Sequence, residues 1–202
     1  MKIAIGGMIA SGKSTLLANL SYEYKDIEVV KDLRAGDFLF DDLLRRTYEG
    51  HTEAGILLQI HFMYKHYKLQ QEYNGRDTFF DRHIIEHWLF AKHRLTDPVV
   101  WRMYNNFFQI LMEDVEQPDL YIILDMNWDT FVDRIYSRNR ETEITNFKYN
   151  KDYFYNLLED YTKKIVAQCE LYNIPYQVVN VDGNSEQETL AIVKKYINNL
   201  II

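Results

Sequence analysis

The chain has 202 residues, 47% of them hydrophobic, which is enough for one sizeable core and predicts a single domain. Its 30 acidic residues outnumber 23 basic ones, and the net charge of −7 argues against nucleic acid or an anionic membrane as a partner. A single cysteine excludes an internal disulfide, and without a membrane-length apolar run or a signal-peptide pattern we expect a cytoplasmic protein.

Short apolar runs alternate along the chain with longer segments of helical periodicity. The expected strands are residues 2–5, 27–30, 78–80, 120–124 and 176–181. The expected helices are residues 14–22, 38–48, 53–73, 83–92, 99–116, 128–138, 151–172 and 185–201. Asp97-Pro98 is typical of a helix start, and Asp182-Gly183-Asn184 of a turn. This alternation predicts an α/β fold with a parallel sheet.

A glycine-rich segment follows the first expected strand and fits the pattern G-x-x-x-x-G-K-[ST]. Its members are Gly7, Met8, Ile9, Ala10, Ser11, Gly12, Lys13, Ser14 and Thr15. The strand before it and the helix after it are the setting of a phosphate-binding P-loop, which disfavours a chance glycine-rich turn. In such a loop Lys13 reaches the β- and γ-phosphates of a nucleotide, and the Ser14 hydroxyl ligates Mg²⁺.

Charged residues follow two other expected strands. Asp32 stands just after the second strand, and Asp81 and Arg82 follow the third. Ligands of open α/β sheets bind beyond the carboxyl ends of the strands, so these residues are candidates for a site. Acids at strand ends also serve as ordinary helix caps, and capping remains an alternative for both. An arginine next to a P-loop has a phosphate to bind.

The expected helix 128–138 leads into a cluster of arginines. Arg134, Arg138 and Arg140 precede Glu141 and Glu143, and positions 134 and 138 share one helical face. Such a cluster is commonly a solvated face balanced by its own glutamates. Together with a P-loop, it indicates a lid over about residues 134–148 that brings guanidinium groups to the transferred phosphoryl.

Five segments in chain order resemble the deoxynucleoside kinase family, with its deoxyadenosine and deoxyguanosine kinases the most similar. They read G-M-I-A-S-G-K-S-T, V-V-K-D, L-L-Q-I-H-F-M-Y-K-H, F-F-D-R-H-I-I-E-H-W-L-F-A and D-R-I-Y-S-R-N-R-E-T-E. The resemblance covers essentially the whole chain. It implies a five-stranded parallel sheet flanked by helices, ATP and Mg²⁺ as cofactors, and a homodimer formed through a helical bundle. The implied reaction transfers the γ-phosphoryl to the 5′-hydroxyl of a deoxynucleoside, with purines slightly favoured.

The resemblance also implies roles for single residues. Asp32 takes the place of the general base that removes the 5′-hydroxyl proton, although the family usually has Glu there. The missing methylene shortens the reach of the carboxylate, and a general base acts only within hydrogen-bond distance. Arg82 matches the arginine that orients this base and the 5′-oxygen. Asp81 matches the acid that holds Mg²⁺ through water.

Further matches concern the sugar, the base and the phosphates. Tyr48 and Glu143 match the pair that contacts the sugar 3′-hydroxyl, and Gln59 matches the glutamine that hydrogen-bonds the base. Taken alone, Gln59 reads as a solvated helix residue and Tyr48 as core packing. The remaining matches are Arg134, Arg138 and Arg140 for phosphate contact and Asp182 for the loop beside the adenine of ATP.

Besides Asp32, two positions depart from the family pattern. Where relatives place an arginine seven residues after the base-reading glutamine, this chain has His66, and the partner aspartate falls at His87. A one-residue shift would supply Glu86 instead. Histidine donates or accepts according to its tautomer, so base choice can differ from that of other members and vary with pH. Simple packing at the pocket edge is the alternative.

Two other functions stay open. A nucleoside monophosphate kinase shares the P-loop and the arginine lid but needs further cations for the acceptor phosphate, and Arg34, Arg45 and Arg46 are candidates. The departures at Asp32, His66 and His87 instead favour a nucleotide-binding module without catalysis.

Overall fold

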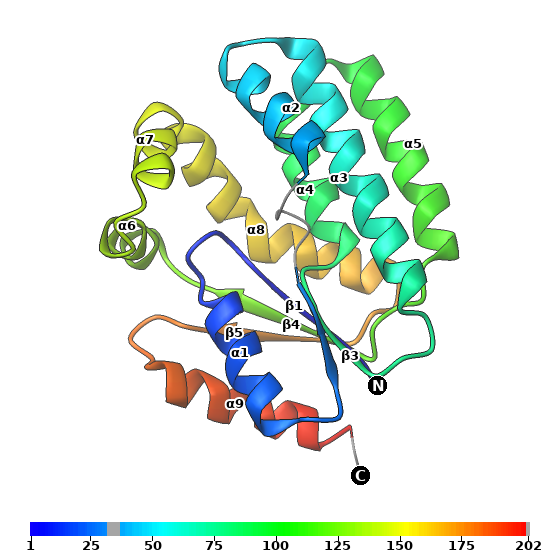
Figure 1. Cartoon of the computed structure of the whole chain (residues 1–202), viewed down its shortest axis with the longest axis vertical. Coiled ribbons are helices and arrows are strands. Elements are labelled where there is room, and N and C mark those ends of the chain that lie inside the picture. The colour runs from blue at the N-terminus through cyan, green and yellow to red at the C-terminus, as the bar shows by residue number, and fades with distance from the viewer. Residues whose placement is uncertain (32–36, 201–202) are drawn as a thin grey trace. The chain divides into compact units, whose positions relative to one another are not determined.

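Figure 1 shows the computed structural model of the chain, which describes residues 1–31 and 37–200. Five parallel strands form one sheet in the order β2-β3-β1-β4-β5. The strands are β1 (Lys2–Gly7), β2 (Glu28–Val30), β3 (Thr78–Asp81), β4 (Leu120–Asp125) and β5 (Tyr176–Asn180). The predicted fold class, an α/β fold with a five-stranded parallel sheet, is confirmed.

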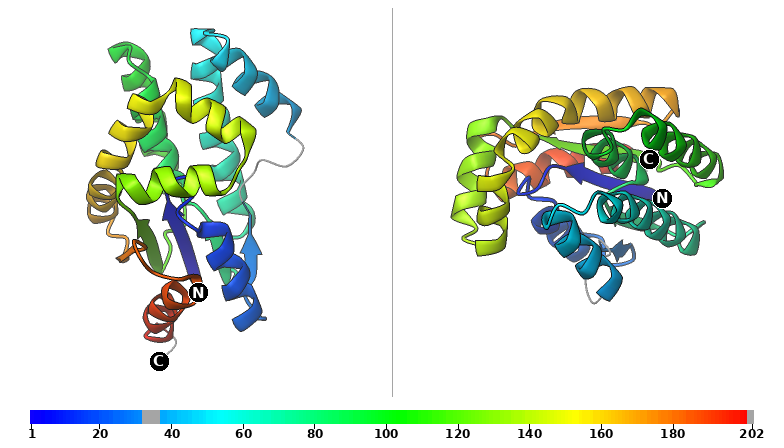
Figure 2. Two further views of the ribbon diagram at one scale, coloured as in Figure 1. Left: turned by 90° about the vertical axis from the view of Figure 1, so that its left-hand side faces the viewer. Right: turned by 90° about the horizontal axis from the view of Figure 1, so that it is seen from above.

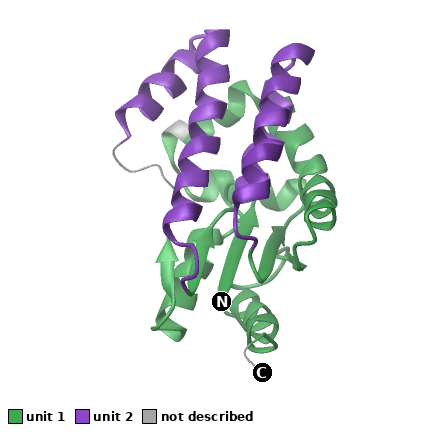
Figure 3. Cartoon of the chain, turned by 90° about the vertical axis from the view of Figure 1, so that its right-hand side faces the viewer, with its two compact units in different colours: residues 1–30, 77–82, 118–202 green, residues 31–76, 83–117 purple. Residues whose placement is uncertain are grey.

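The chain divides into two compact units, coloured separately in Figure 3. Residues 1–30, 77–82 and 118–202 form unit 1, and residues 31–76 and 83–117 form unit 2. Unit 1 holds the sheet with α1 (Lys13–Glu23), α6 (Trp128–Ser137), α7 (Glu141–Tyr149), α8 (Lys151–Leu171) and α9 (Glu186–Asn198). Unit 2 holds α2 (Phe38–Tyr48), α3 (Thr52–Glu72), α4 (Ile84–Arg94) and α5 (Pro98–Asp114). The division concerns packing, and the single domain stays a prediction.

The core of unit 1 lies on both faces of the sheet. In Figure 1, α1 and α9 lie on one side of the strands and α8 on the other. β1 runs through the middle of the sheet, between β3 and β4 (Figure 2). All residues of β1 are buried, and so are the first five of β4. Continuous apolar runs such as Leu120–Leu124 arise because a parallel strand covered by helices on both faces is shielded from water on both sides.

Unit 2 is held by a separate apolar cluster between α2 and α3. Phe40 and Leu43 from α2 pack with Ala54 and Leu58 from α3, and the partly buried ring of Phe62 joins them. The start of α5 is as predicted, because the Asp97 side chain accepts hydrogen bonds from the backbone of the next helical turn.

The sequence-based boundaries differ from the structure mainly in two places. The last helix ends at Asn198, and a helix over Glu141–Tyr149 was not predicted. It has only nine residues, fewer than the about 11 over which an apolar repeat can be recognised, so the sequence alone does not reveal it. Within residues 1–31 and 37–200, no helix is both long and apolar enough to cross a membrane.

Candidate active site

The P-loop connects β1 to α1 by a tight turn. Gly7 and Gly12 adopt φ angles of 152° and 98°, which favour glycine, and Ala10 lies in the left-handed region at 63°. A Cβ at Gly7 would lie 2.4 Å from the Ser11 hydroxyl, so a side chain there does not fit. The two glycines of the motif therefore stand where the backbone conformation requires glycine. Gly12 is the N-cap of α1 and makes no side-chain cap, which leaves the first amides of the helix for another acceptor.

Two cations meet at the end of β1. The Lys13 ammonium donates to the carbonyl oxygens of Gly7 and Met8 at 2.7 and 2.9 Å. Arg82 donates from Nη1 to the same Gly7 oxygen at 3.1 Å, and its backbone N–H bonds to Ile5 at 3.0 Å. Both side chains are more than nine-tenths buried. This arrangement places two positive charges beside the P-loop, where a phosphate group would be stabilised.

Arg82 has an unusual backbone conformation as well as an unusual position. Its φ angle is +80°, which is uncommon for a residue with a Cβ. It directly follows Asp81, the last residue of β3, which lies opposite Ile5 of β1 in the sheet. Strained residues persist where the surrounding structure holds them, often at functional sites. The backbone thus supports the functional reading of Arg82 independently of its residue type.

The residues predicted to hold Mg²⁺ supply a small set of oxygen ligands. Ser14 is exposed in the first turn of α1, and Asp81 is half-buried at the end of β3. Among the described residues, no three histidine, cysteine or acidic side chains gather as they would around a metal ion. Two protein oxygens fit Mg²⁺, which keeps several waters and takes its other ligands from substrate phosphates.

Arg134 on α6 braces the P-loop. Its guanidinium donates to the carbonyl oxygens of Ala10 and Ser11 at 3.4 and 3.1 Å and to Val181 after β5 at 2.9 Å. One side chain therefore joins the phosphate-binding loop to the loop that precedes α9. Its predicted contact with phosphate remains a prediction, and bracing is the role that the geometry displays.

Asp182 lies in that second loop and is fixed by hydrogen bonds. Both carboxylate oxygens accept from the Asn127 backbone N–H at 3.1 Å, and Asn180 donates at 3.2 Å. Although burial acts to raise the pKa of Asp182, hydrogen bonds from Thr130, Asn127 and Asn180 and the charge of Arg134 lower it. The loop is thereby tied to the start of α6, and its predicted contact with adenine stays a prediction.

The other two arginines of the predicted lid share one carboxylate. Arg140 donates to Glu143 Oε1 at 2.9 Å, and Arg138 Nη1 lies 3.4 Å from Oε2. Glu143 stands in the first turn of α7, two residues after the helix begins. The lid of the sequence analysis thus corresponds to the end of α6, the turn after it and α7, and within it Arg138 and Arg140 both pair with Glu143.

In unit 2, α3 carries a buried polar face formed by Gln59, His66 and Gln70, which we call the polar face of α3. Their exposed fractions are 6%, 0% and 1%, respectively. Among the described residues, Gln59 Oε1 has no hydrogen-bond partner. An unpaired buried acceptor is unfavourable, so a ligand that donates a hydrogen bond would be stabilised there. Gln59 is therefore not the solvated helix residue that its type alone would suggest.

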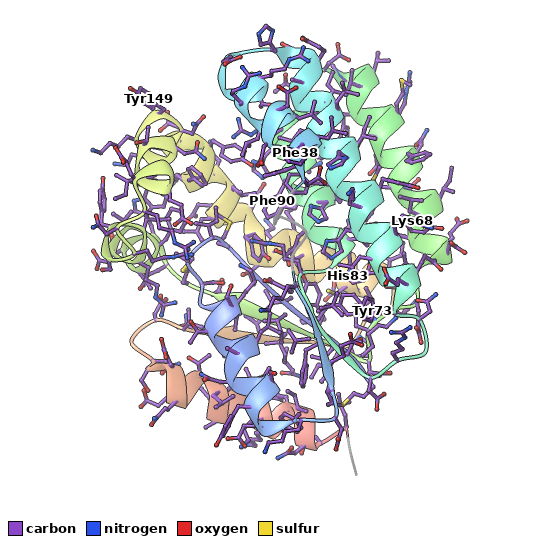
Figure 4. The ribbon with its side chains drawn as sticks, in the orientation of Figure 1. Phe38, Lys68, Tyr73, His83, Phe90 and Tyr149 are labelled. Carbon is purple, nitrogen blue, oxygen red and sulfur yellow. The ribbon has the colours of Figure 1, made fainter. Side chains whose placement is uncertain are left out.

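The structure brings the two predicted histidines together. His87 Nε2 on α4 lies 2.9 Å from His66 Nδ1, so one of these nitrogens donates to the other. Phe62 stacks on His87 at 5.3 Å between ring centroids. Phe90, labelled in Figure 4, belongs to the same helix as His87, and the centroids of these two rings are 6.2 Å apart. The Tyr104 hydroxyl donates to the His87 carbonyl at 3.2 Å. Both histidines are at least 97% buried, and their predicted contact with the base remains a prediction.

The chain resembles known proteins over nearly its whole length. A family model described as deoxynucleoside kinase matches residues 3–202. The chain belongs to the deoxynucleoside kinase family. It is similar to an uncharacterised protein of Mycoplasma pneumoniae, at 35% identity over 95% of this chain and 87% of that protein. It is also similar to a deoxyadenosine kinase of Dictyostelium discoideum, at 32% identity over 70% of this chain and 58% of that protein.

The fold of this kinase also matches solved structures. A deoxyadenosine kinase from M. mycoides with the products dCMP and dCDP bound superposes with a TM-score of 0.80. The match covers 98% of this chain and all of the other, at 25% identity. The resemblance read from the sequence is thus confirmed, and the chain is an ATP-dependent kinase.

Three residues named for this kinase cannot be placed. Asp32 and Arg34 lie outside the described residues, and so does the side chain of Tyr48. Their proposed roles therefore stay predictions. The other two arginines of the monophosphate kinase alternative are placed, and both pair with carboxylates. Arg45 bonds to Asp42 and Glu49 at 2.7 and 2.6 Å, and Arg46 bonds to Glu53 at 2.9 Å.

Sequence reasoning missed one ionic cluster of this kinase. Asp37, the N-cap of α2, bonds to Nε2 of His61 at 2.8 Å and to the Lys65 ammonium at 3.1 Å. The hydrogen bond from His61 holds the pKa of Asp37 well below its usual range, with burial opposing and Lys65 and the Phe40 N–H adding to it. The i,i+4 spacing of His61 and Lys65 was a signal, but it does not reveal a partner on another helix.

Proposed function

We propose that this kinase transfers the γ-phosphoryl of ATP to the 5′-hydroxyl of a deoxynucleoside, as in nucleotide salvage. The observation that carries the proposal is the meeting of Lys13 and Arg82 on the Gly7 carbonyl oxygen. Their position beside the P-loop suits a triphosphate whose charge spreads over the transferred oxygens. Because both substrates are cytoplasmic metabolites, we also propose a cytoplasmic location.

The proposed roles follow the chemistry of each group. Lys13 and the amides of the P-loop bind the β- and γ-phosphates, while Ser14 and Asp81 would hold Mg²⁺ with water, which neutralises phosphate charge when bound. Asp32 accepts the proton of the 5′-hydroxyl, and Arg82 orients the carboxylate and the attacking oxygen. These roles are filled by the P-loop, the acidic side chains and Arg82, and the proposed reaction uses no cofactor besides ATP and Mg²⁺.

For the base we propose purines as the favoured substrates, with deoxyadenosine first. The unpartnered Oε1 of Gln59 accepts a hydrogen bond, and adenine offers one from its exocyclic amino group. Relatives named deoxyadenosine kinase support this choice. Cytosine presents a similar amino group, and the similar M. mycoides enzyme holds dCMP, so deoxycytidine is the second substrate to test.

The decisive experiment supplies Mg-ATP with each deoxynucleoside and each monophosphate in turn and follows product formation. We expect 5′-monophosphates to form from deoxynucleosides, with deoxyadenosine giving the highest kcat/KM. Phosphorylation of monophosphates alone would favour the monophosphate kinase, against which the paired charges of Arg45 and Arg46 argue. Binding without turnover of any acceptor would favour the non-catalytic module.

The general base is tested by replacing Asp32. Asp32→Asn should reduce kcat by about 10²- to 10⁴-fold, because a positioned base contributes that much, while the affinity for ATP is kept. Asp32→Glu restores the usual residue of the family and should retain activity. Asp26→Asn, an exposed acid before β2, is the matched control. Equal turnover in Asp32→Asn and wild type would remove Asp32 from the mechanism.

We also propose that the kinase is a homodimer formed by α3 and α5. These helices pack side by side in unit 2 (Figure 1), and each exposes an apolar stripe at helical spacing. On α5 the stripe is Val99, Met103, Phe107 and Ile110, and on α3 it is Leu57, Ile60 and Tyr64, each at least 40% exposed. Exposed apolar stripes on neighbouring helices are typical of an interface.

The dimer is tested by measuring the mass in solution by light scattering. Wild type should be a dimer, and Met103→Asp should be a monomer because it places a charge in the centre of the stripe. Leu171→Asp, an exposed apolar residue on α8, should leave the mass unchanged. A monomeric wild type at micromolar concentration would contradict the proposal.

A further inference from the structure

Arg134, on α6, bonds to backbone groups of two separate loops of unit 1. Its Nη1 donates to the carbonyl oxygens of Ala10 and Ser11 at 3.4 and 3.1 Å, and its Nη2 donates to that of Val181 at 2.9 Å. The 3.4 Å distance marks a weak bond, so the contacts with Ser11 and Val181 fix the guanidinium. The cation therefore meets the P-loop at its peptide groups.

The bond to Ser11 sets the direction of the next amide. The Ser11 carbonyl and the Gly12 N–H belong to one peptide group, and no peptide bond among the described residues is cis. In a planar trans peptide the C=O and N–H bonds point in opposite directions, so the Gly12 N–H points away from Arg134. A cation on the carbonyl oxygen also polarises the peptide group, which makes its N–H a stronger donor.

The Gly12 amide stands in the phosphate-binding part of the loop. Gly12 is the N-cap of α1, and the amides at a helix N-terminus bind anions. In P-loops the backbone N–H groups cradle the α- and β-phosphates of the nucleotide. The direction of this amide therefore affects how tightly the loop holds those two phosphates.

The backbone of the P-loop needs support from outside the loop. Ala10 has a φ angle of 63°, a left-handed conformation that is unfavourable for a residue with a Cβ. Such a conformation persists where surrounding contacts hold it. Arg134 supplies contacts of this kind, because it bonds to the carbonyl group of Ala10 and to that of the next residue, Ser11.

The other side of the guanidinium is held by the loop after β5. Val181 accepts from Nη2, and its own N–H donates to the Asp125 carbonyl oxygen at 2.9 Å. Asp182, the next residue, accepts from the backbone N–H of Asn127, the N-cap of α6. Guanidinium donors lie in one plane and point in fixed directions, so carbonyl groups on two loops hold this side chain in one orientation. The single ammonium of a lysine does not reproduce these bonds.

We propose that Arg134 is a positioning residue for the donor nucleotide: it aims the Gly12 N–H at the α- and β-phosphates and does not touch the transferred phosphoryl. The proposal differs from the direct phosphate contact that the family resemblance implies, because Nη1 and Nη2 both bond to backbone carbonyl groups. It also goes beyond the proposed function, since it concerns the phosphate donor alone and holds for any acceptor.

The test compares wild type with Arg134→Met by measuring dissociation constants in a calorimeter. The ligands are Mg-ADP, a Mg-bound non-hydrolysable ATP analogue and Mg-tripolyphosphate, which has no base and no sugar. All three contain two linked phosphates, so we expect Arg134→Met to bind each of them about tenfold more weakly, the lower end of what a hydrogen bond to a charged group contributes. In steady-state kinetics, KM for ATP should rise by the same factor while kcat changes less than about threefold.

Two further variants separate geometry from charge. Arg134→Lys keeps the positive charge but loses the planar fork, so it should still weaken all three ligands by about fivefold or more. This variant decides the question if Arg134→Met does not fold, which far-ultraviolet circular dichroism and Tm establish. Lys163→Met removes an exposed positive charge from α8 of the same unit and is the matched control, which should bind all three ligands as wild type does.

Hydrogen exchange tests the effect on the loop directly. Without nucleotide, the amides of the P-loop should exchange faster in Arg134→Met than in wild type, because the loop has lost the contacts that hold it. Lys163→Met should leave these exchange rates unchanged. Unchanged rates in Arg134→Met would contradict the inference.

Equal losses for the three ligands support the inference, and unequal losses overturn it. A loss confined to the ATP analogue would indicate direct contact with the transferred phosphoryl, and a loss confined to the two nucleotides would place the effect on adenosine. Full affinity in Arg134→Lys would mean that charge alone suffices. A wild type that did not bind tripolyphosphate would contradict a loop that recognises phosphate by itself. These binding measurements use no acceptor, so they remain decisive even if the acceptor is not a deoxynucleoside.

Discussion

The phosphate-binding loop after β1 and the polar face of α3 are held by different kinds of contact. In the loop the contacts are made through the backbone, since Lys13, Arg82 and Arg134 all donate to its carbonyl oxygens. On the polar face of α3, the contacts are between side chains, and His66 meets His87 from another helix 21 residues away.

If the polar face of α3 binds the base, as proposed, this difference determines which part of the kinase can change its substrate preference. The amides of a backbone cradle do not change when side chains are replaced, because every residue except proline offers the same N–H group. A pocket lined by side chains changes its hydrogen-bonding pattern whenever one side chain is replaced. The departures from the family pattern that the sequence analysis predicts fall at Asp32, His66 and His87, and none of them falls within the P-loop.

The largest effect that tests this comparison comes from the P-loop lysine. Lys13→Met keeps the aliphatic chain but removes the charge beside the triphosphate, and we expect kcat/KM to fall about 10²- to 10³-fold. Ser11→Ala should change kcat/KM less than about threefold, because the buried Ser11 hydroxyl has no hydrogen-bond partner among the described residues. Steady-state kinetics with Mg-ATP and deoxyadenosine measures both.

Lys25→Met, an exposed lysine in the loop after α1, is the control for loss of a positive charge. If Ser11→Ala lowered kcat/KM as much as Lys13→Met does, the loop would depend on its side chains as much as the polar face of α3 does. The difference between the two regions would then not hold. If kcat/KM of Lys13→Met stayed within about tenfold of the wild-type value, the assignment of phosphate binding to the P-loop would be contradicted.

The sequence predicts local features well and long-range contacts poorly, as these residues illustrate. The strand, turn and helix around Lys13 follow from a contiguous pattern, and so does the order of elements that yields the sheet. Arg134 bonds to Ser11, 123 residues before it, and to Val181, 47 residues after it, and neither contact has a local signal in the sequence. The burial of Gln59 and His66 depends on packing among helices of unit 2, because a polar residue on a helix is ordinarily expected to face solvent.

The second prediction concerns the stability of the polar face of α3. His66→Leu and His87→Leu should each lower the free energy of unfolding by about 1–3 kcal/mol, because each leaves a buried imidazole nitrogen without its partner. The double variant should cost less than the sum of the two, since it removes both polar partners together. Urea unfolding followed by circular dichroism gives all four free energies.

His51→Leu is the control for this pair, because its side chain is half exposed. If the losses in the free energy of unfolding of the two single variants added up to that of the double variant, the histidines would act independently despite their 2.9 Å contact. Measuring kcat/KM of the same variants with deoxyadenosine and deoxyguanosine provides a second test. A shift in the ratio of kcat/KM between deoxyadenosine and deoxyguanosine would place the pair in base selection, whereas unchanged ratios with lowered stability would leave it a packing element.

The smallest predicted effect lies at the start of α2, in the cluster of Asp37, His61 and Lys65. Asp37→Asn keeps a good N-cap but removes the charge, so it should lower the free energy of unfolding by about 1 kcal/mol or less at pH 6. The folded pKa of Asp37 lies below its unfolded value. Its stabilisation is therefore complete above the unfolded value of about 3.9 and is lost as the pH falls towards the folded one.

The gap in Tm between wild type and Asp37→Asn should thus be constant from pH 6 to about pH 5 and narrow progressively below about pH 4. Asp97→Asn is the matched control, because Asp97 also caps a helix but has no cationic partner among the described residues. A gap of equal size for both variants would assign the effect to capping alone. A gap for Asp37→Asn that persisted unchanged at pH 3 would mean that its contacts with His61 and Lys65 do not depend on the carboxylate charge, and unit 2 would then rely on ionic side-chain pairs less than the distances indicate.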